Sequence, residues 1–134
     1  MKGFFPDQSD HGAVTPFEYL PCGAITPKAG LALVLTNGLL ALATGDTAPT
    51  YICMKDADAE VTERTIIPVV RVDKDRIYET TNSAAFSSAK IGQKVTLHTD
   101  GLQVTATTDS GVAEIVDFDD KAKSGAGGTV HVRF

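Results

Sequence analysis

The stretch that decides the fold is residues 31–43, Leu-Ala-Leu-Val-Leu-Thr-Asn-Gly-Leu-Leu-Ala-Leu-Ala. Two apolar runs, Leu31–Thr36 and Leu39–Ala43, flank the dipeptide Asn37-Gly38. Asn-Gly between two such runs is the strongest short signal for a two-residue β-hairpin, because both turn residues must adopt positive φ. The stretch therefore predicts an antiparallel hairpin.

A second copy of this hairpin follows later in the chain, where Val95–Thr99 and Leu102–Thr107 flank Asp100-Gly101. The residues before each hairpin also match, since Lys-Ala-Gly at 28–30 corresponds to Lys-Ile-Gly at 90–92. Two copies of so long a unit are not a solenoid array. We predict an intramolecular duplication, with repeat units at about 28–72 and 90–133.

Most of the remaining chain also has strand character. No window of 11 or more residues keeps a helical apolar period, and Thr81–Ala89 is the one place where a short helical turn is expected. Pro68 predicts an edge strand or a bulge. The expected fold is all-β, a small barrel or sandwich made of the two duplicated hairpin units. Further strands are expected at Thr50–Met54, Thr65–Val72, Arg76–Thr80, Val112–Phe118 and Thr129–Phe134.

Residues 1–30 hold four of the six prolines, which argues against a helix or a central strand there. They also hold Phe4, Phe5, Phe17 and Tyr19, which a solvated tail would not need. We interpret residues 1–30 as an extended Pro-rich N-terminal arm and residues 31–134 as a single β domain. We expect residues 1–16 to reach a neighbouring subunit or capsid protein, with the aromatic residues of the arm as anchors. The alternative is an arm that closes one end of its own barrel.

The two hairpins differ in the polarity of their faces. In the second copy, Lys94, Thr96, His98, Gln103 and Thr105 form a polar face, as expected of a half-buried hairpin. The first copy is apolar on both faces, so the extra face must be covered by its own domain, by the arm or by another subunit. The apolar face that is a candidate for subunit contact consists of Leu31, Leu33, Leu35, Leu40 and Leu42.

Composition excludes some classes of partner. The net charge of −5 disfavours binding to nucleic acid. The chain has no signal-peptide pattern, and no apolar run is long enough for a membrane span. The two cysteines, Cys22 and Cys53, form no CxxC pair and are expected to be buried free thiols in a protein made in a bacterial cytoplasm.

The one motif that suggests an enzyme is Asp109-Ser110-Gly111, which a retropepsin-like aspartic protease would use to pair two carboxylates across a dimer. Thr107 and Thr108 precede it in place of the apolar residues that would bury the aspartate. Asp, Ser and Gly are also common turn residues. We therefore predict no catalytic residues.

No cofactor or metal site is expected either. His11, His98 and His131 have no ligand spacing, and His131 is expected to face away from its valine neighbours. Two acidic clusters, Asp56–Glu60 and Asp117–Asp120, lack the spacing of an EF-hand; ion binding by Asp117, Asp119 and Asp120 stays open. The Gly-rich stretch at 124–128 lacks the Lys of a phosphate loop and is expected to be a connection.

Three segments resemble small proteins of tailed phages and prophages whose genes typically lie beside the major capsid gene. They are EYLPCGAITPKAGLALVLTNGLLALATGDTAPTYICM (18–54), IIPVVRV (66–72) and KIGQKVTLHTDGLQVTATTDSGVAEIVDFD (90–119). The resemblance covers roughly residues 17–134, and it extends more loosely to the head decoration (cement) proteins, which are small, β-rich and often trimeric.

The resemblance implies a virion structural protein on the phage head surface, which binds the major capsid protein and stabilises the head. It also implies a homo-oligomer, with a trimer favoured. Two alternatives are kept: another virion β module, such as a head-fibre base or a tail component, and the retropepsin-like protease.

Overall fold

The computed structural model describes residues 2–8 and 16–134. Its strands form two five-stranded antiparallel sheets, and the only helix in these ranges is α1, a single short turn. The elements, in chain order, are β1 (Phe5–Gln8), β2 (Phe17–Pro21), β3 (Ala32–Thr36), β4 (Leu39–Leu42), β5 (Tyr51–Cys53), β6 (Ile66–Arg71), β7 (Ile77–Thr81), β8 (Lys94–Val95), β9 (Ala113–Phe118), α1 (Asp120–Ser124) and β10 (Thr129–Arg133).

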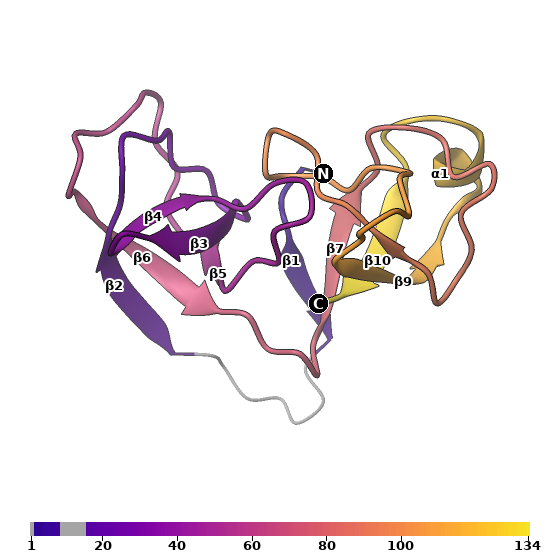
Figure 1. Ribbon diagram of the computed structural model, residues 1–134, viewed down its shortest axis with the longest axis horizontal. Helices are drawn as coiled ribbons and strands as arrows, with labels where there is room; N and C mark the ends of the chain where they lie inside the picture. Colours follow the sequence, from indigo (N-terminus) through magenta and orange to yellow (C-terminus); the bar gives the residue numbers. More distant parts are fainter. Residues whose placement is uncertain (1, 9–15) are drawn as a thin grey trace.

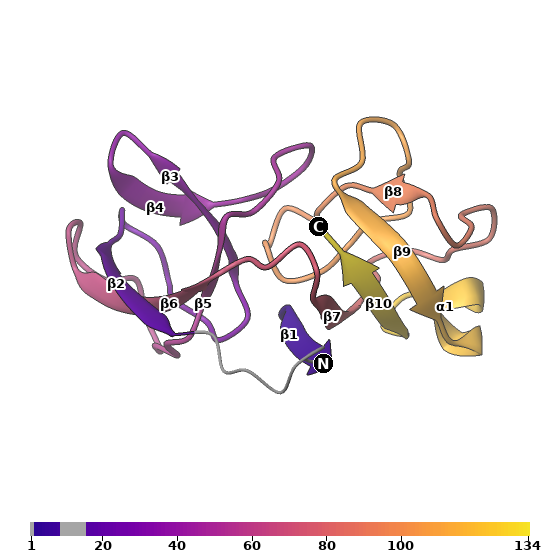
Figure 2. The same cartoon turned by 90° about the horizontal axis from the view of Figure 1, so that it is seen from below.

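The strand order is β2-β6-β5-β3-β4 in the first sheet, called sheet 1 here, and β1-β7-β10-β9-β8 in the second, called sheet 2. The two sheets lie side by side in both views of the molecule (Figures 1 and 2). The arrangement is sandwich-like, and neither sheet closes into a barrel. The predicted fold class, all-β and built from strand hairpins, is confirmed.

The first hairpin forms as predicted. Asn37 and Gly38 have φ angles of 52° and 79°, as a two-residue turn of this kind requires. The turn sets the register, so that Leu33 lies opposite Leu42 and Leu35 lies opposite Leu40. These four leucines therefore share one face of the hairpin, as the sequence indicated.

The second hairpin is less regular than predicted. Its turn forms, with the His98 N–H donating to the Gln103 carbonyl at 2.9 Å, but β8 spans only Lys94–Val95 and residues 102–107 form no continuous strand. The ladder is interrupted at Thr96, whose carbonyl accepts from the Thr105 N–H while its own N–H donates to the Thr107 carbonyl. The Val104 N–H donates to Thr81 of β7 at 3.1 Å, and Leu97 exchanges hydrogen bonds with Gly45.

The duplication is visible in the strand order, because β2-β6-β5-β3 of sheet 1 corresponds to β7-β10-β9-β8 of sheet 2. The residue that follows β2 and the residue that follows β7 each make a parallel bridge to the hairpin of their own unit. These bridges are Cys22 to Leu40 and Asn82 to Val104. Sheet 2 has one additional strand, β1, at the edge formed by β7. β1 pairs with β7 at the position where the equivalent strand β2 has no neighbour in the described part of the chain.

The start of the chain differs from the prediction. Residues 2–8 fold back on their own chain: the Gly3 N–H donates to the Leu102 carbonyl, the Phe4 N–H donates to the Gly30 carbonyl, and β1 is a strand of sheet 2. Phe4 is fully buried and its ring meets that of Phe134 edge to face, with centroids 5.4 Å apart. The expectation that residues 1–16 do not fold back on their own domain is therefore wrong for residues 2–8; contact of this segment with another chain stays a prediction, and residues 9–15 lie outside the described ranges.

The buried side chains form two clusters. The main core packs sheet 2 against one face of sheet 1 and includes Phe4, Tyr78, Ile52 and Val70. The second core lies on the opposite face of sheet 1. Its members are Cys22, Leu31, Leu33, Leu40, Tyr51, Cys53, Ile67 and Val69.

Two local predictions are also corrected. Pro68 is not at an edge or a bulge, because β6 lies between β2 and β5. The strand tolerates Pro68 because its carbonyl accepts from Met54, one residue beyond the end of β5, so its missing N–H falls where the ladder ends. The short helix is α1, which Asp119 caps by accepting from the Ala122 N–H at 2.8 Å, and not the predicted turn at 81–89.

Candidate functional site

An exposed apolar surface lies on β2 and β6, on the same face of sheet 1 as the buried Val70. Phe17, Tyr19 and Ile66 are 51%, 65% and 56% exposed, and the half-buried Pro21 and Pro68 complete the set. The register places Phe17, Tyr19 and Pro21 opposite Val70, Pro68 and Ile66, so all five side chains share one face of sheet 1. We call these five residues the β2–β6 patch.

The patch carries no charge. The one charged residue of β2 is Glu18, whose side chain lies on the opposite face of the sheet by strand alternation. There it accepts two hydrogen bonds from Arg71, at 3.1 and 3.2 Å. The patch is therefore uncharged, and the Glu18–Arg71 ion pair lies on the opposite face of the sheet. An uncharged apolar surface favours contact with another apolar surface.

The backbone of β2 is open at Phe17 and Tyr19 on the side away from β6. Cys22 donates to Thr65 and accepts from Arg64, so its backbone groups point toward the β6 side. Alternation along the strand then directs those of Phe17 and Tyr19 outward. β4 meets this side just beyond the end of β2, where the Gly23 N–H donates to the Leu40 carbonyl at 3.0 Å; beside Phe17 and Tyr19 no strand pairs with it among residues 2–8 and 16–134. The patch and the open edge lie on the same strand.

The equivalent surface of sheet 2 is polar. The register pairs Glu79 of β7 with His131 of β10 as it pairs Tyr19 with Pro68 in sheet 1. The His131 ring contacts Asp117 through Nδ1 and Glu79 through Nε2, the latter at 3.2 Å. His131 faces away from the buried Val130 and Val132, as predicted. The same position of the fold thus carries an ionic cluster in one unit and an apolar patch in the other.

The predicted interaction residues divide between the surface and the core. Of the arm aromatics, Phe17 and Tyr19 are exposed, Phe5 is half-buried and Phe4 is in the main core. Ile66 and Pro68 were missed as members of the patch. Their signal was present, because in Ile-Ile-Pro-Val at 66–69 they alternate with the two buried residues.

The leucines of the first hairpin also divide. Leu31, Leu33 and Leu40 belong to the second core, and the domain itself covers them. Leu35 and Leu42 are 41% and 38% exposed on the same face of the hairpin. They form a second exposed apolar surface, the hairpin surface, on the face of sheet 1 opposite the β2–β6 patch.

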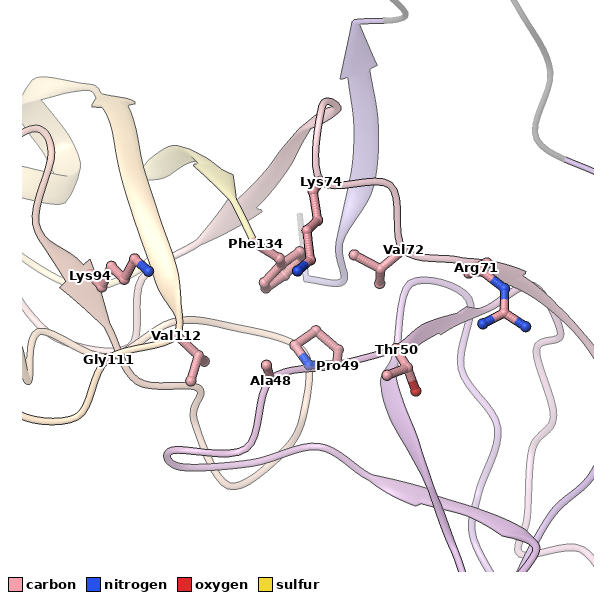
Figure 3. Close-up of a pocket in the computed structure, with 10 residues that line it drawn as sticks. All are labelled: Ala48, Pro49, Thr50, Arg71, Val72, Lys74, Lys94, Gly111, Val112 and Phe134. Carbon is pink, nitrogen blue, oxygen red and sulfur yellow. The ribbon is translucent and has the colours of Figure 1, made fainter.

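A cleft of about 550 Å³ lies between the two sheets (Figure 3). Pro49, Val72, Val112 and Phe134 give it apolar walls. Its cationic lining residues are Arg71, Lys74 and Lys94. Arg71 is already engaged by Glu18, and the two lysines are exposed, so the cleft has no buried polar group that would fix a ligand.

Asp109 lies in an exposed turn beside Ser110, which has a φ of 58°. A carboxylate dyad of the protease type needs its aspartates close together and shielded from water. The exposed position of Asp109 gives no such shielding. The turn assignment made from the sequence therefore agrees with the position of this residue.

The acidic cluster at 117–120 has structural partners. Asp117 contacts His131, and Asp119 accepts from the N–H groups of Ala122 and Thr129. These hydrogen bonds lower the pKa of Asp119. Within the part of the chain that the structure describes, no group of three His, Cys, Asp or Glu side chains could hold a metal ion. Of the other histidines, His98 is half-buried beside its turn and His11 lies outside the described ranges.

Cys22 and Cys53 are both buried as free thiols, as predicted. Burial raises the pKa of each thiol. Raised pKa values disfavour the thiolate, which is the reactive form. The described ranges also contain no helix with the length and apolarity needed to cross a membrane.

Comparisons with protein-family models, with curated proteins and with solved structures found no match to this chain.

Proposed function

We propose that this chain is a virion structural protein, a decoration or cement protein that binds the major capsid protein of a tailed-phage head as a homo-oligomer. The role is one of binding and stabilisation, not of chemistry. The proposal starts from the resemblance of residues 17–134 to small phage proteins.

The observation that carries the proposal is the presence of two apolar surfaces on opposite faces of sheet 1. The β2–β6 patch and the hairpin surface, formed by Leu35 and Leu42, are both exposed within residues 2–8 and 16–134. Exposed apolar patches of this kind mark sites of protein–protein contact. A cement protein needs two kinds of contact, with the capsid lattice and with its own copies, so a chain with two such surfaces suits the role.

The protease alternative receives no support from the surroundings of Asp109. Asp109 is exposed in a turn, next to Ser110 with its positive φ angle. A pair of catalytic carboxylates needs shielding from water, which this position does not give. Under the proposed function, Asp109→Asn leaves binding to heads unchanged.

The direct test is co-sedimentation of the purified protein with expanded heads assembled from a tailed-phage major capsid protein. Wild-type protein should pellet with the heads at a fixed stoichiometry and raise the temperature at which they disassemble. The variant with both Leu35→Ser and Leu42→Ser should lose most of this binding. Ile91→Ser, which alters an exposed isoleucine elsewhere in the chain, is the control.

The result that contradicts the proposal is wild-type protein that stays in the supernatant at all concentrations. If the double serine variant binds heads as well as wild type does, the protein still binds heads but the hairpin surface is not part of the contact.

A further inference from the structure

The cleft between the two sheets is lined by equivalent parts of the two repeats. The Thr50 N–H donates to β3 at 2.9 Å, as the Val112 N–H donates to β8 at 3.0 Å. Thr50 and Val112 are therefore equivalent, and so are the residues that precede them, Pro49 and Gly111. All four line the cleft. Binding sites lie preferentially at such junctions between units.

The lining of the cleft carries only positive charge. Its charged members in the described ranges are Arg71, Lys74 and Lys94, whereas the whole chain has a net charge of −5. Figure 3 shows Lys74 and Lys94 at the cleft on two different segments of the chain. Asp73 and Asp109 are close in sequence to lining residues but do not line the cleft themselves. The cleft therefore favours a negatively charged occupant.

The two lysines are available for such an occupant. Both are exposed, and neither makes an ion pair with any residue in 2–8 and 16–134. Glu114 lies opposite Lys94 in the register of β8 and β9, but its carboxylate is bound by Arg133 at 3.7 Å. A small ligand would find no buried polar partner here. A protein segment that its own chain holds in place needs none, provided that it offers carboxylates beside an apolar side chain.

The chain itself has a loop of this chemistry between β5 and β6. Hydrogen bonds fix both ends of the loop: the Ala57 N–H donates to the Pro27 carbonyl at 2.9 Å, and the Val61 N–H donates to the Ile25 carbonyl at 3.0 Å. The three residues between these ends, Asp58-Ala59-Glu60, are all exposed, and we call them the loop tip. Neither carboxylate of the loop tip makes an ion pair within the part of the chain that the structure describes.

The loop tip is far from the cleft of its own chain. The segment from β5 to β6 lies at the end of sheet 1 away from sheet 2 in both views (Figures 1 and 2), whereas the cleft lies between the sheets. A contact between loop tip and cleft must therefore join two copies.

We propose that the loop tip of one copy binds in the cleft of the next, with Asp58 and Glu60 beside Lys74 and Lys94. Ala59 then faces the apolar walls. Because loop and cleft are different surfaces, the contact is head-to-tail, and it either closes into a ring or continues as an open chain. A ring of three uses every loop and every cleft and agrees with the trimer that the resemblance favours. The inference rests on the homo-oligomer of the proposed function and not on head binding.

Sedimentation of the full chain at two salt concentrations is the first measurement. Exposed ion pairs are individually weak, so wild-type protein at about 0.01 M salt should associate beyond a dimer over roughly the micromolar to millimolar range. At about 1 M salt the Debye length falls to about 3 Å, and the association should weaken by about tenfold or more.

Charge reversal in the cleft tests the site. The variant with both Lys74→Glu and Lys94→Glu should associate about tenfold or more weakly than wild type at low salt, because two attractive pairs become repulsive. The matched control carries Lys90→Glu and Lys123→Glu, which reverse two exposed lysines outside the cleft and change the net charge equally. The control should associate much more strongly than the cleft variant.

Charge reversal in the loop tests the partner. The variant with both Asp58→Lys and Glu60→Lys should also stay monomeric alone. Mixed with the cleft variant, it should associate, because each reversed surface then meets its complement on the other protein. Recovery on mixing requires both variants to be folded, so it separates a lost contact from a lost fold.

The proposal is overturned if wild-type protein stays monomeric at low salt, if its association stops at a dimer, or if salt does not weaken it. It also fails if the cleft variant and its control associate equally, or if the mixture of reversed variants stays monomeric. None of these measurements involves phage heads, so failure here is distinguishable from failure of the proposed function.

Discussion

Replacing Phe4 by alanine tests whether the start of the chain is part of the fold. Phe4 is fully buried in the main core, although residues 1–30 have the composition of an arm. Its ring packs against Phe134, whose ring in turn lies 5.4 Å from that of Tyr78. The alanine substitution leaves a cavity where these rings met, and the neighbouring strands can only partly close it.

The magnitude follows from the type of site. A buried Phe→Ala change costs about 3–5 kcal/mol of unfolding free energy, from lost transfer energy and the cavity together. A domain of this size has only about 5–15 kcal/mol in total. With a urea slope of roughly 2 kcal/mol per molar, the unfolding midpoint should fall by about 2 M.

The matched control is Phe17→Ala, because Phe17 lies in the same Pro-rich stretch but is 51% exposed. It should shift the midpoint little, within about 0.5 kcal/mol, as surface changes usually do. Urea titrations followed by far-UV circular dichroism suit a chain that has no tryptophan. The reasoning is refuted if Phe4→Ala unfolds at the same urea concentration as Phe17→Ala, since Phe4 would then lie outside the core.

Three further outcomes follow from single side chains. Asn82 is fully buried and bonds three carbonyls and one N–H, so Asn82→Ala should cost about 3 kcal/mol or more by thermal unfolding; a loss below 1 kcal/mol would contradict this. The pKa of Asp119 is lowered, so its stabilising effect is present above the unfolded pKa of about 4 and is lost as the pH falls further. The melting-temperature difference between wild type and Asp119→Asn should therefore shrink in acid, and a constant difference would argue against the cap. Cys22 and Cys53, buried and with raised pKa values, should react with iodoacetamide only after denaturation, as mass spectrometry of intact protein can show.

The features that sequence predicted well are those fixed by neighbouring residues. The Asn37-Gly38 turn determines the register of β3 and β4, so the shared face of Leu33 and Leu42 follows without knowledge of the rest of the chain. Alternation along β10 likewise placed His131 outside, between two buried valines. The all-β class followed from the density of such local signals.

The features that sequence missed depend on residues far apart. Nothing near Phe4 indicates that Gly30 and Leu102 will accept its hydrogen bonds and those of Gly3. The second hairpin has the same turn signal as the first, but its ladder shifts at Thr96, which accepts from Thr105 and donates to Thr107. The site was recognised only in part: Phe17 and Tyr19 were identified, whereas their partners on β6 required the pairing of two strands about 50 residues apart in sequence.

The position of β7 between β1 and β10 also bears on the order in which the chain can fold during synthesis. Sheet 1 uses residues 17–71, so all its strands have been synthesised before β7. The central position of sheet 2 is taken by β10, at residues 129–133, and until those residues emerge β1 has no completed sheet to join. Although β1 leaves the ribosome before β2–β10, it is therefore among the last of these strands to find its place, and Phe4 stays exposed to solvent and to chaperones until then.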